Sequence, residues 1–199
     1  MKAKNVFLIG DSTCYGDPPF ELKPGYGRYV RDMLKGQAEV NYPDENCRFA
    51  QYTLRYLHEW ASKVDRYAVD VVHWNNGLWD VLQLYNDEPL TPLNMYVDTL
   101  HRVYKRIRLL FPNAKVIFAM SLPANEDVNT VAFARFNAVV DQYNDAAKKL
   151  MGELHVPVNN LHAVAPPYDD NYLSPDRVHL NEKGSRILAS AVMKAIDAL

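Results

Sequence analysis

The sequence has few of the residues on which several protein classes depend. Two cysteines, Cys14 and Cys47, are too few for a disulfide scaffold, and their spacing fits no zinc-binding pattern. Both fall in loops that we expect at one crevice, which leaves a disulfide open, although free thiols are typical of a cytosolic protein. The chain also lacks a glycine-rich phosphate-binding loop, and no glycine occurs between Gly36 and Gly77.

Excess charge of one sign and long hydrophobic runs are also absent from the sequence. A formal net charge of −2 argues against a nucleic-acid-binding protein, which would usually be basic. No apolar run approaches the roughly 18 residues of a membrane span. The first apolar run, Val6–Ile9, is too short for a signal peptide and is soon followed by Asp11. We therefore expect a cytoplasmic protein that binds neither nucleic acid nor membranes.

The length and the order of the apolar segments indicate one α/β domain over residues 1–199. Hydrophobic residues make up 48% of the 199 residues and charged residues 23%, an ordinary balance for a globular protein. Strand and helix patterns alternate, which predicts a three-layer α/β/α sandwich with a five-stranded parallel sheet, flavodoxin-like in type. The predicted strands are 6–9, 39–41, 69–75, 115–120 and 155–158. The predicted helices are 26–35, a segment through 54–64, a segment from a Thr91 cap and Pro92 to 111, a segment through 136–150, and a last helix capped by Asn181.

The interpretation is built around the segment Lys4–Gly16, KNVFLIGDSTCYG. Its apolar run predicts a buried strand that breaks at Gly10-Asp11-Ser12, where glycine permits a tight turn. A serine just beyond the carboxyl end of the first strand lies where α/β folds bind their ligands. The turn would present the Ser12 hydroxyl as a nucleophile and its backbone N–H to an oxyanion. Gly, Asp and Ser also form ordinary turns, so this segment alone leaves both interpretations open.

A serine nucleophile needs a general base, usually histidine, and an acid that orients the base. The spacing Asp-x-x-His occurs at residues 70–73, 98–101 and 176–179. The first pair falls in a strand, where an odd offset places the two side chains on opposite faces, and the second falls within a helix. Only Asp176 and His179 lie in a loop after the last strand, where the chain can bend the carboxylate toward the imidazole. We expect this pair to be catalytic; the alternative is a loop of helix-capping polar residues.

Polar residues also follow the third predicted strand. Asn75, Asn76 and Gly77 stand at its carboxyl end and face the same crevice. An asparagine amide can donate to a developing oxyanion, and the loss of one such donor typically costs about 10²–10³ in rate. Strand alternation places Asn75 with His73 on one face and Trp74 with Asn76 on the other. The alternative is that the two asparagines only shape a turn.

Taken in chain order, these three elements resemble the SGNH, or GDSL-like, hydrolases. They are Gly10-Asp11-Ser12, the Gly/Asn element after the third strand, and Asp176-Arg177-Val178-His179 before the last helix. The resemblance covers Val6–Leu199 and implies a flavodoxin-like fold and ester hydrolysis through an acyl-serine intermediate. By position it implies Ser12 as nucleophile, His179 as general base and Asp176 as its orienting acid. Such a mechanism requires no metal ion and no organic cofactor.

Two parts of the chain depart from the family pattern. The third block usually reads Gly-x-Asn-Asp, whereas this chain reads Gly77-Leu78-Trp79-Asp80, with a donor-only indole where asparagine is expected. Asn75 or Asn76 would supply the amide from a shifted position, and we favour Asn75. The family's second block carries a glycine whose N–H completes the oxyanion hole. Since this chain has no glycine there, a backbone N–H within residues 46–51 would serve.

The expected partner is a small-molecule ester. No long apolar insertion suggests a site for a long acyl chain. Aromatic residues at the predicted crevice suit sugar rings, so our hypothesis is a carbohydrate O-acetyl ester, although several of these residues can equally pack in the core. They are Tyr15, Trp74, Trp79, Tyr168 and Tyr172. A second hypothesis is a catalytically degenerate protein that binds a sugar or an acyl group, and a weaker third is nucleotide or flavin binding.

Overall fold

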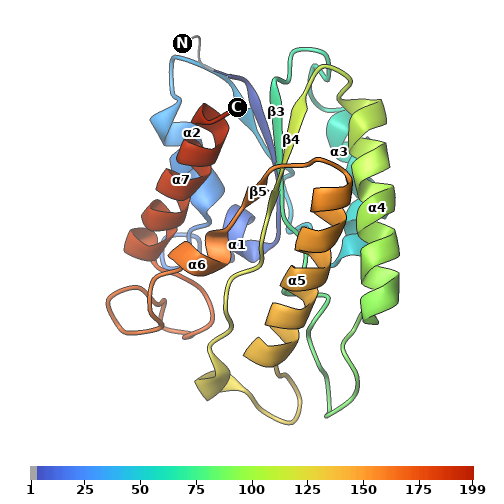
Figure 1. Ribbon diagram of the computed structural model, residues 1–199. Coiled ribbons are helices and arrows are strands. Elements are labelled where there is room, and N and C mark those ends of the chain that lie inside the picture. Colours follow the sequence, from blue (N-terminus) through green and yellow to red (C-terminus); the bar gives the residue numbers. More distant parts are fainter. Residues whose placement is uncertain (1–3) are drawn as a thin grey trace.

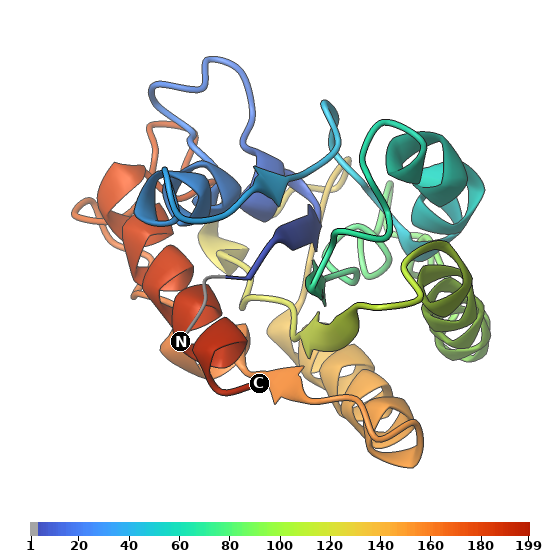
Figure 2. The same cartoon turned by 90° about the horizontal axis from the view of Figure 1, so that it is seen from above.

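The computed structural model describes residues 4–199, and its strands form a single parallel sheet. The order across the sheet is β2-β1-β3-β4-β5, which confirms the predicted five-stranded sheet (Figures 1 and 2). All five carboxyl ends point toward one edge, where the connecting loops gather at the lower end of Figure 1. The strands are β1 (Val6–Ile9), β2 (Val40–Asn41), β3 (Val71–Trp74), β4 (Lys115–Ala119) and β5 (Val158–Asn159).

Helices cover both faces of the sheet and complete the three layers. Figure 1 shows α2 and α7 on one side, and α3, α4 and α5 on the other. The longer helices are α2 (Tyr26–Met33), α3 (Ala50–Ala61), α4 (Leu93–Leu110), α5 (Asn137–Glu153) and α7 (Glu182–Asp197); the shorter ones are α1 (Ser12–Tyr15), η1 (Glu126–Val128) and α6 (Leu161–Val164). No helix among residues 4–199 is long and apolar enough to cross a membrane.

The alternation of the strands divides the apolar core into two halves. Val6 and Leu8 of β1 pack toward α2 and α7, whereas Phe7 and Ile9 pack toward α3, α4 and α5. The Phe7 and Phe111 ring centroids are 4.9 Å apart on the second side. Fully burying one such side chain is worth about 1.5–3 kcal/mol, so the two halves together fix the sheet between its helices.

Several predicted element boundaries differ from the structure by one to three residues, and the structure explains two of these differences. Thr91 does not cap α4: Pro92 occupies the N-cap position, and the Thr91 hydroxyl instead donates to Gln51. The last strand begins at Val158 rather than at His155, because His155 adopts a left-handed conformation (φ 54°) in the turn that follows α5. The predicted Asn181 cap is confirmed, since its side chain accepts the N–H of Gly184.

Candidate active site

Ser12 is the first residue of α1, directly beyond the carboxyl end of β1. Asp11 caps this helix, and its Oδ1 accepts the Thr13 N–H at 2.9 Å and the Thr13 hydroxyl at 2.8 Å. A Cβ at Gly10 would lie 2.6 Å from Cys14 Cβ, so only glycine allows α1 to pack this closely on the strand end. The Ser12 N–H makes no hydrogen bond within residues 4–199, as is usual for the first N–H groups of a helix. The turn therefore exposes both a hydroxyl and a backbone donor.

His179 reaches Ser12 from the loop before α7. Its Nε2 is 3.0 Å from Ser12 Oγ, and its Nδ1 is 2.9 Å from Asp176 Oδ2. The turn is closed by Ser174 N–H donating to His179 O, and Arg177 turns the chain with a left-handed φ of 58°. With Nδ1–H bound to the carboxylate, Nε2 keeps its lone pair and accepts the Ser12 hydroxyl. The structure thus brings together three predicted residues that lie up to 167 positions apart.

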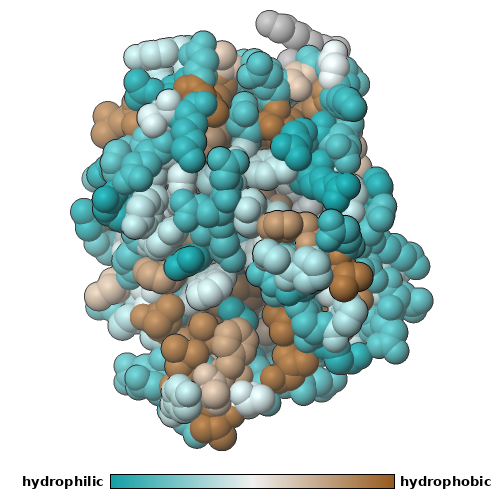
Figure 3. Space-filling view, turned by 180° about the vertical axis from the view of Figure 1, so that it is seen from behind, coloured by the Kyte–Doolittle hydropathy of each residue, from teal (hydrophilic) through white to brown (hydrophobic). Residues whose placement is uncertain are grey.

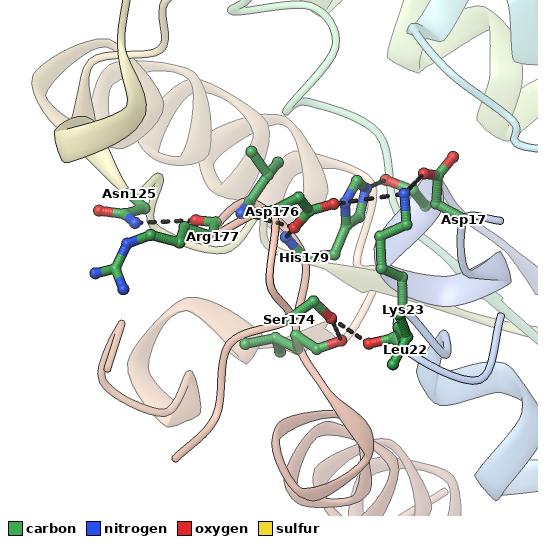
Figure 4. Close-up of polar contacts among 11 residues, drawn as sticks. Asp17, Leu22, Lys23, Asn125, Ser174, Asp176, Arg177 and His179 are labelled. Atoms are coloured by element: carbon green, nitrogen blue, oxygen red, sulfur yellow. Dashed lines mark hydrogen bonds and ion pairs between the residues drawn. The ribbon is translucent and has the colours of Figure 1, made fainter. Parts of the chain in front are cut away.

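Asp176 is held as a carboxylate by its own loop. Burial alone would raise its pKa, but hydrogen bonds from the His179 N–H and imidazole and from the Val178 N–H lower the pKa below its usual value. Figure 4 shows the Lys23 ammonium between Asp17 and Asp176. The hydrogen bond to Asp17 is the main cause that raises the pKa of Lys23.

The same cluster contains three groups with the spacing of metal ligands. One ligand atom each from Asp17, Asp176 and His179 lies within 4.8 Å of the others. The Lys23 ammonium already pairs with both carboxylates, at 3.5 Å to Asp176 Oδ2, and His179 is engaged on both ring nitrogens. The arrangement therefore fits an ion-pair network better than a cation site.

The polar residues after β3 lie differently from our expectation. The Asn75 amide donates to Ala119 O at 2.8 Å, and the Asn76 amide donates to Arg48 O and Thr53 Oγ1. Both asparagines are buried, and neither lines the hollows that contain Ser12. The geometry thus argues against the favoured donor Asn75, and against Asn76, because both amides hold neighbouring strands and loops together.

The alternation predicted for His73, Trp74 and Asn76 is nevertheless confirmed. His73 meets the Tyr26 ring edge-on on the α2 side, whereas Asn76 accepts the Trp74 indole N–H on the α3 side. Burial lowers the pKa of His73 to about 3, so this histidine is a neutral core residue. Gly77 has a φ of 154°, and a Cβ there would lie 2.1 Å from Ser121 Oγ, which makes it a structural glycine.

Asp80 links the loop that follows β3 to the beginning of α3. Its two carboxylate oxygens lie 3.1 and 3.2 Å from the Ala50 N–H, one of the otherwise unpaired first donors of α3. Burial raises its pKa to about 7, opposed chiefly by the hydrogen bond from the Ala50 N–H. The Asp of the family's third block therefore serves the packing of this chain.

Two hollows meet at Ser12 and His179, and both are also lined by Leu78, Phe133 and Arg135. The first, which we call the narrow hollow, has a volume of about 50 Å³; the second, the wide hollow, has about 230 Å³. The narrow hollow has a largely apolar lining that includes Pro24, Leu78, Leu122, Pro123, Val128, Tyr168 and Leu180. The wide hollow adds Asp11, Asp17, Asn46 and Trp79. Figure 3 shows hydrophobic side chains gathered at this end of the molecule.

Only part of the predicted aromatic rim lies at these hollows. Trp79 lines the wide hollow and Tyr168 the narrow one. Trp74 is a core residue, and Tyr15 lines a separate surface depression. Tyr172 lies beneath the Lys183 ammonium, 4.7 Å from it. The sequence could not separate these residues, because aromatic side chains fill cores and rims alike.

The wide hollow contains two donors that the sequence pattern did not single out. Trp79 is half-buried, and its indole N–H makes no hydrogen bond within residues 4–199. Asn46 also lines the hollow; its Oδ1 accepts the Arg48 N–H, and its amide N–H groups make no hydrogen bond among the described residues. Asn46 lies in the stretch 46–51 from which we expected a second-block donor, so these two residues replace Asn75 and Asn76 as candidates.

Two basic residues at the site were missed. Lys23 lies in the Pro-rich loop 17–23 that follows α1, so its nearness to Ser12 in the sequence was the available signal. Arg135 lines both hollows from the loop between η1 and α5, and burial lowers its pKa to about 10. Nothing local in the sequence marks this arginine, because the long loop after β4 is placed by contacts with distant residues.

Comparison with known proteins agrees with this fold. Residues 8–187 match the GDSL-like Lipase/Acylhydrolase family, and the chain therefore belongs to that family. A curated relative, the GDSL esterase/lipase CPRD49 of Arabidopsis thaliana, is 26% identical over 117 residues, which cover 54% of this chain and 46% of the relative. The chain thus aligns with less than half of that protein's length.

Solved structures with the same fold include two esterases or acylhydrolases from bacteria. The lipase/acylhydrolase of Enterococcus faecalis superposes with a TM-score of 0.75 at 16% identity, over 98% of this chain and 96% of that one. Axe2, an acetylxylan esterase of Geobacillus stearothermophilus, superposes with a TM-score of 0.70 at 21% identity, over 98% and 96%. At these identities the likeness establishes the fold. The family match and the shared fold thus agree with each other.

Proposed function

We propose that the protein hydrolyses a short-chain carboxylic ester through an acyl-Ser12 intermediate. The observation that carries the proposal is the hydrogen-bonded chain from Ser12 Oγ to His179 Nε2 and from His179 Nδ1 to Asp176, at 3.0 and 2.9 Å. His179 takes the Ser12 proton as Oγ attacks the ester carbonyl. The protonated imidazole gives that proton to the leaving alcohol and then activates the water that releases the acid. Asp176 fixes the tautomer and stabilises the imidazolium.

The oxyanion is held by the Ser12 N–H and by the Trp79 indole N–H. Both donors lack a partner within residues 4–199, and both belong to residues lining the wide hollow. An oxyanion needs donors only, and an indole supplies one without an acceptor to repel the developing charge. Trp79 also stands where the family pattern has its asparagine. This assignment replaces Asn75, whose amide is bound to Ala119 O.

The acyl group we propose is acetyl, and the alcohol is a carbohydrate hydroxyl. One water molecule needs roughly 10–15 Å³ of cavity volume. The narrow hollow, at about 50 Å³, therefore has room for about three to five waters, which is close to the size of an acetyl group. Trp79 and Tyr168 offer flat faces at the hollows for a sugar ring. The fold shared with an acetylxylan esterase supports the same substrate class.

The experiment compares Ser12→Ala with the matched control Ser190→Ala. Ser190 is an exposed serine of α7, remote from the hollows, whose hydroxyl donates to Arg186 O. With 4-nitrophenyl acetate, Ser12→Ala is expected to lose at least about 10⁴-fold in kcat/KM, while Ser190→Ala stays within about twofold. Folding is checked by thermal unfolding of both variants.

Two further readouts sharpen the result. A fluorophosphonate reagent is expected to label the native protein and Ser190→Ala but not Ser12→Ala. The rate is expected to fall from 4-nitrophenyl acetate to the octanoate, because the longer chain exceeds the narrow hollow. Full activity in Ser12→Ala would end the esterase proposal, and a preference for octanoate would end the acetyl assignment. An unlabelled, inactive native protein would instead favour the degenerate binding protein.

A further inference from the structure

Arg135 is a cation without a carboxylate partner, and it faces the proposed reaction site. It lines both hollows together with Ser12 and His179. It takes part in none of the ion pairs among residues 4–199. Its side chain is half-buried, and its Nη atoms are not among the buried atoms that lack partners, so they remain accessible to solvent. A partly buried arginine is normally paired.

The loop around Arg135 holds the guanidinium in place. Asn129 clamps the backbone of Arg135 from both sides, accepting its N–H at 3.0 Å and donating to its O at 2.8 Å. The Arg135 Nε donates to Leu78 O, in the loop that follows β3. The Phe133 ring lies beneath the guanidinium, with Cζ 4.6 Å from the ring centroid. These contacts use Nε and one face of the side chain, and the two Nη groups make no hydrogen bond within residues 4–199.

The other charged side chains near the crevice differ from Arg135 in their partners. Lys23 is paired with Asp17 and Asp176. The negative charge of Asp11 raises the pKa of Arg135 and so favours the charged guanidinium, but Asp11 forms no ion pair with Arg135. The Oδ1 atom of Asp11 accepts two hydrogen bonds from Thr13, and its buried Oδ2 atom has no hydrogen-bond partner. Among the described residues, the Arg135 guanidinium is thus the one basic group that lines both hollows and has no ion-pair partner.

We propose that Arg135 binds a carboxylate carried by the substrate next to the scissile ester. This inference rests on the esterase function proposed above and adds the substrate's charge to it. Guanidinium and carboxylate match as planar groups that form two parallel hydrogen bonds, and such bonds are stronger than neutral ones. If the substrate is a carbohydrate ester, it is then an acetylated sugar acid rather than an acetylated neutral sugar.

The experiment uses pairs of esters in which one member has a carboxylate where the other has a neutral group. 3-Carboxyphenyl acetate against 3-carbamoylphenyl acetate places the charge on the alcohol, and 4-nitrophenyl hemisuccinate against 4-nitrophenyl butyrate places it on the acyl group. The native enzyme is expected to favour the charged member of the alcohol pair by about 10–100-fold in kcat/KM. Added salt is expected to reduce this preference. A preference confined to the acyl pair would place the carboxylate on the acid side.

Variants of Arg135 separate recognition from folding. Arg135→Met is expected to abolish the charge preference, measured as the ratio of kcat/KM on the charged ester to that on the neutral ester; Arg135→Lys is expected to retain part of this ratio. Arg55→Met is the control, because Arg55 is an exposed α3 residue paired with Glu59. Equal losses on charged and neutral esters in Arg135→Met, or no charge preference in the native enzyme, would overturn the proposal and leave the esterase function standing.

Binding gives an answer that does not depend on turnover. Ser12→Ala is titrated with galacturonate and with galactose, and line shifts are followed by NMR. Galacturonate is expected to bind at least about 10-fold more tightly, and Arg135→Met in the same background is expected to remove the difference. Equal affinities for the two sugars would count against recognition of a sugar acid. If no ester of any kind were hydrolysed, the esterase function would fail and this titration alone would decide the role of Arg135.

Discussion

Two polar clusters lie at the carboxyl edge of the sheet, and they differ in where their hydrogen bonds end. In the cluster of Ser12, His179 and Asp176, the chain of hydrogen bonds ends at a hydroxyl that faces a hollow. In the cluster after β3, the amides of Asn75 and Asn76 end on backbone and side-chain atoms of neighbouring elements. Both clusters have residue types suited to catalysis. Only the first leaves a reactive group open to a ligand.

The difference teaches that a polar residue at a strand end is not by itself a site residue. A buried amide without partners costs about 1–3 kcal/mol, so a folded chain engages it wherever a carbonyl is in reach. Asn76 accepts from Trp74 and donates to Thr53 and Arg48, and thereby joins β3 to α3 and to the loop before it. The following predictions test whether the two clusters really divide into chemistry and packing.

The largest effect is expected for His179→Ala. No other described side chain is bonded to Ser12 Oγ, so the variant removes the base and should lose about 10⁴-fold or more in kcat/KM for 4-nitrophenyl acetate. His162→Ala is the control, since His162 lies on α6 and contacts Asp141 at 3.3 Å. Its rate should match that of the native protein. Comparable activity in both variants would remove the distinction between the clusters.

An intermediate effect is expected for Trp79→Phe, measured beside Asn75→Ala. The phenylalanine keeps an aromatic ring but loses the N–H, so kcat should fall by about 10²–10³ with little change in KM. Asn75→Ala should lower thermal stability, because Ala119 O loses its donor, while activity per folded molecule stays within a few-fold. A hundredfold loss in Asn75→Ala would return the oxyanion role to the end of β3. A loss in Asn46→Ala with none in Trp79→Phe would assign the donor to Asn46.

The smallest effect concerns the pH dependence of stability and involves Asp80. Its folded pKa of about 7 lies above the usual value near 4, so the folded state holds this proton more tightly than the unfolded state. The stabilisation is complete below about pH 4 and is lost as the pH rises through 7.

The test compares melting temperatures from pH 5 to pH 8. The native protein should lose several degrees relative to Asp80→Asn over this range, because the amide does not titrate. Asp145→Asn, at an exposed position of α5, is the control and should show no such trend. A constant difference between Asp80→Asn and the native protein across the range would show that Asp80 is ionised throughout.

Much of the architecture could be predicted because it depends on local patterns. The apolar run 6–9, the periodic apolar residues of α3 and α4, and the Asn181 cap each specify their element through contacts with near neighbours in sequence. The boundaries that failed, at Thr91 and His155, depend on backbone conformations that tertiary contacts select. The presence of an element is therefore easier to predict than the residue at which it ends.

The sequence by itself determined the α/β class, the strand that leads to Ser12, and the one Asp-x-x-His pair in a loop that can reach it. These follow from periodicity and from chain order, since parallel strands bring all their carboxyl ends to one edge. Only the tertiary structure decided that Asn75 and Asn76 belong to the packing, and that Trp79, Asn46 and Arg135 face the hollows. The physical reason is that a donor's availability depends on which carbonyls and acids the rest of the fold brings within reach, and residue type and spacing do not carry that information.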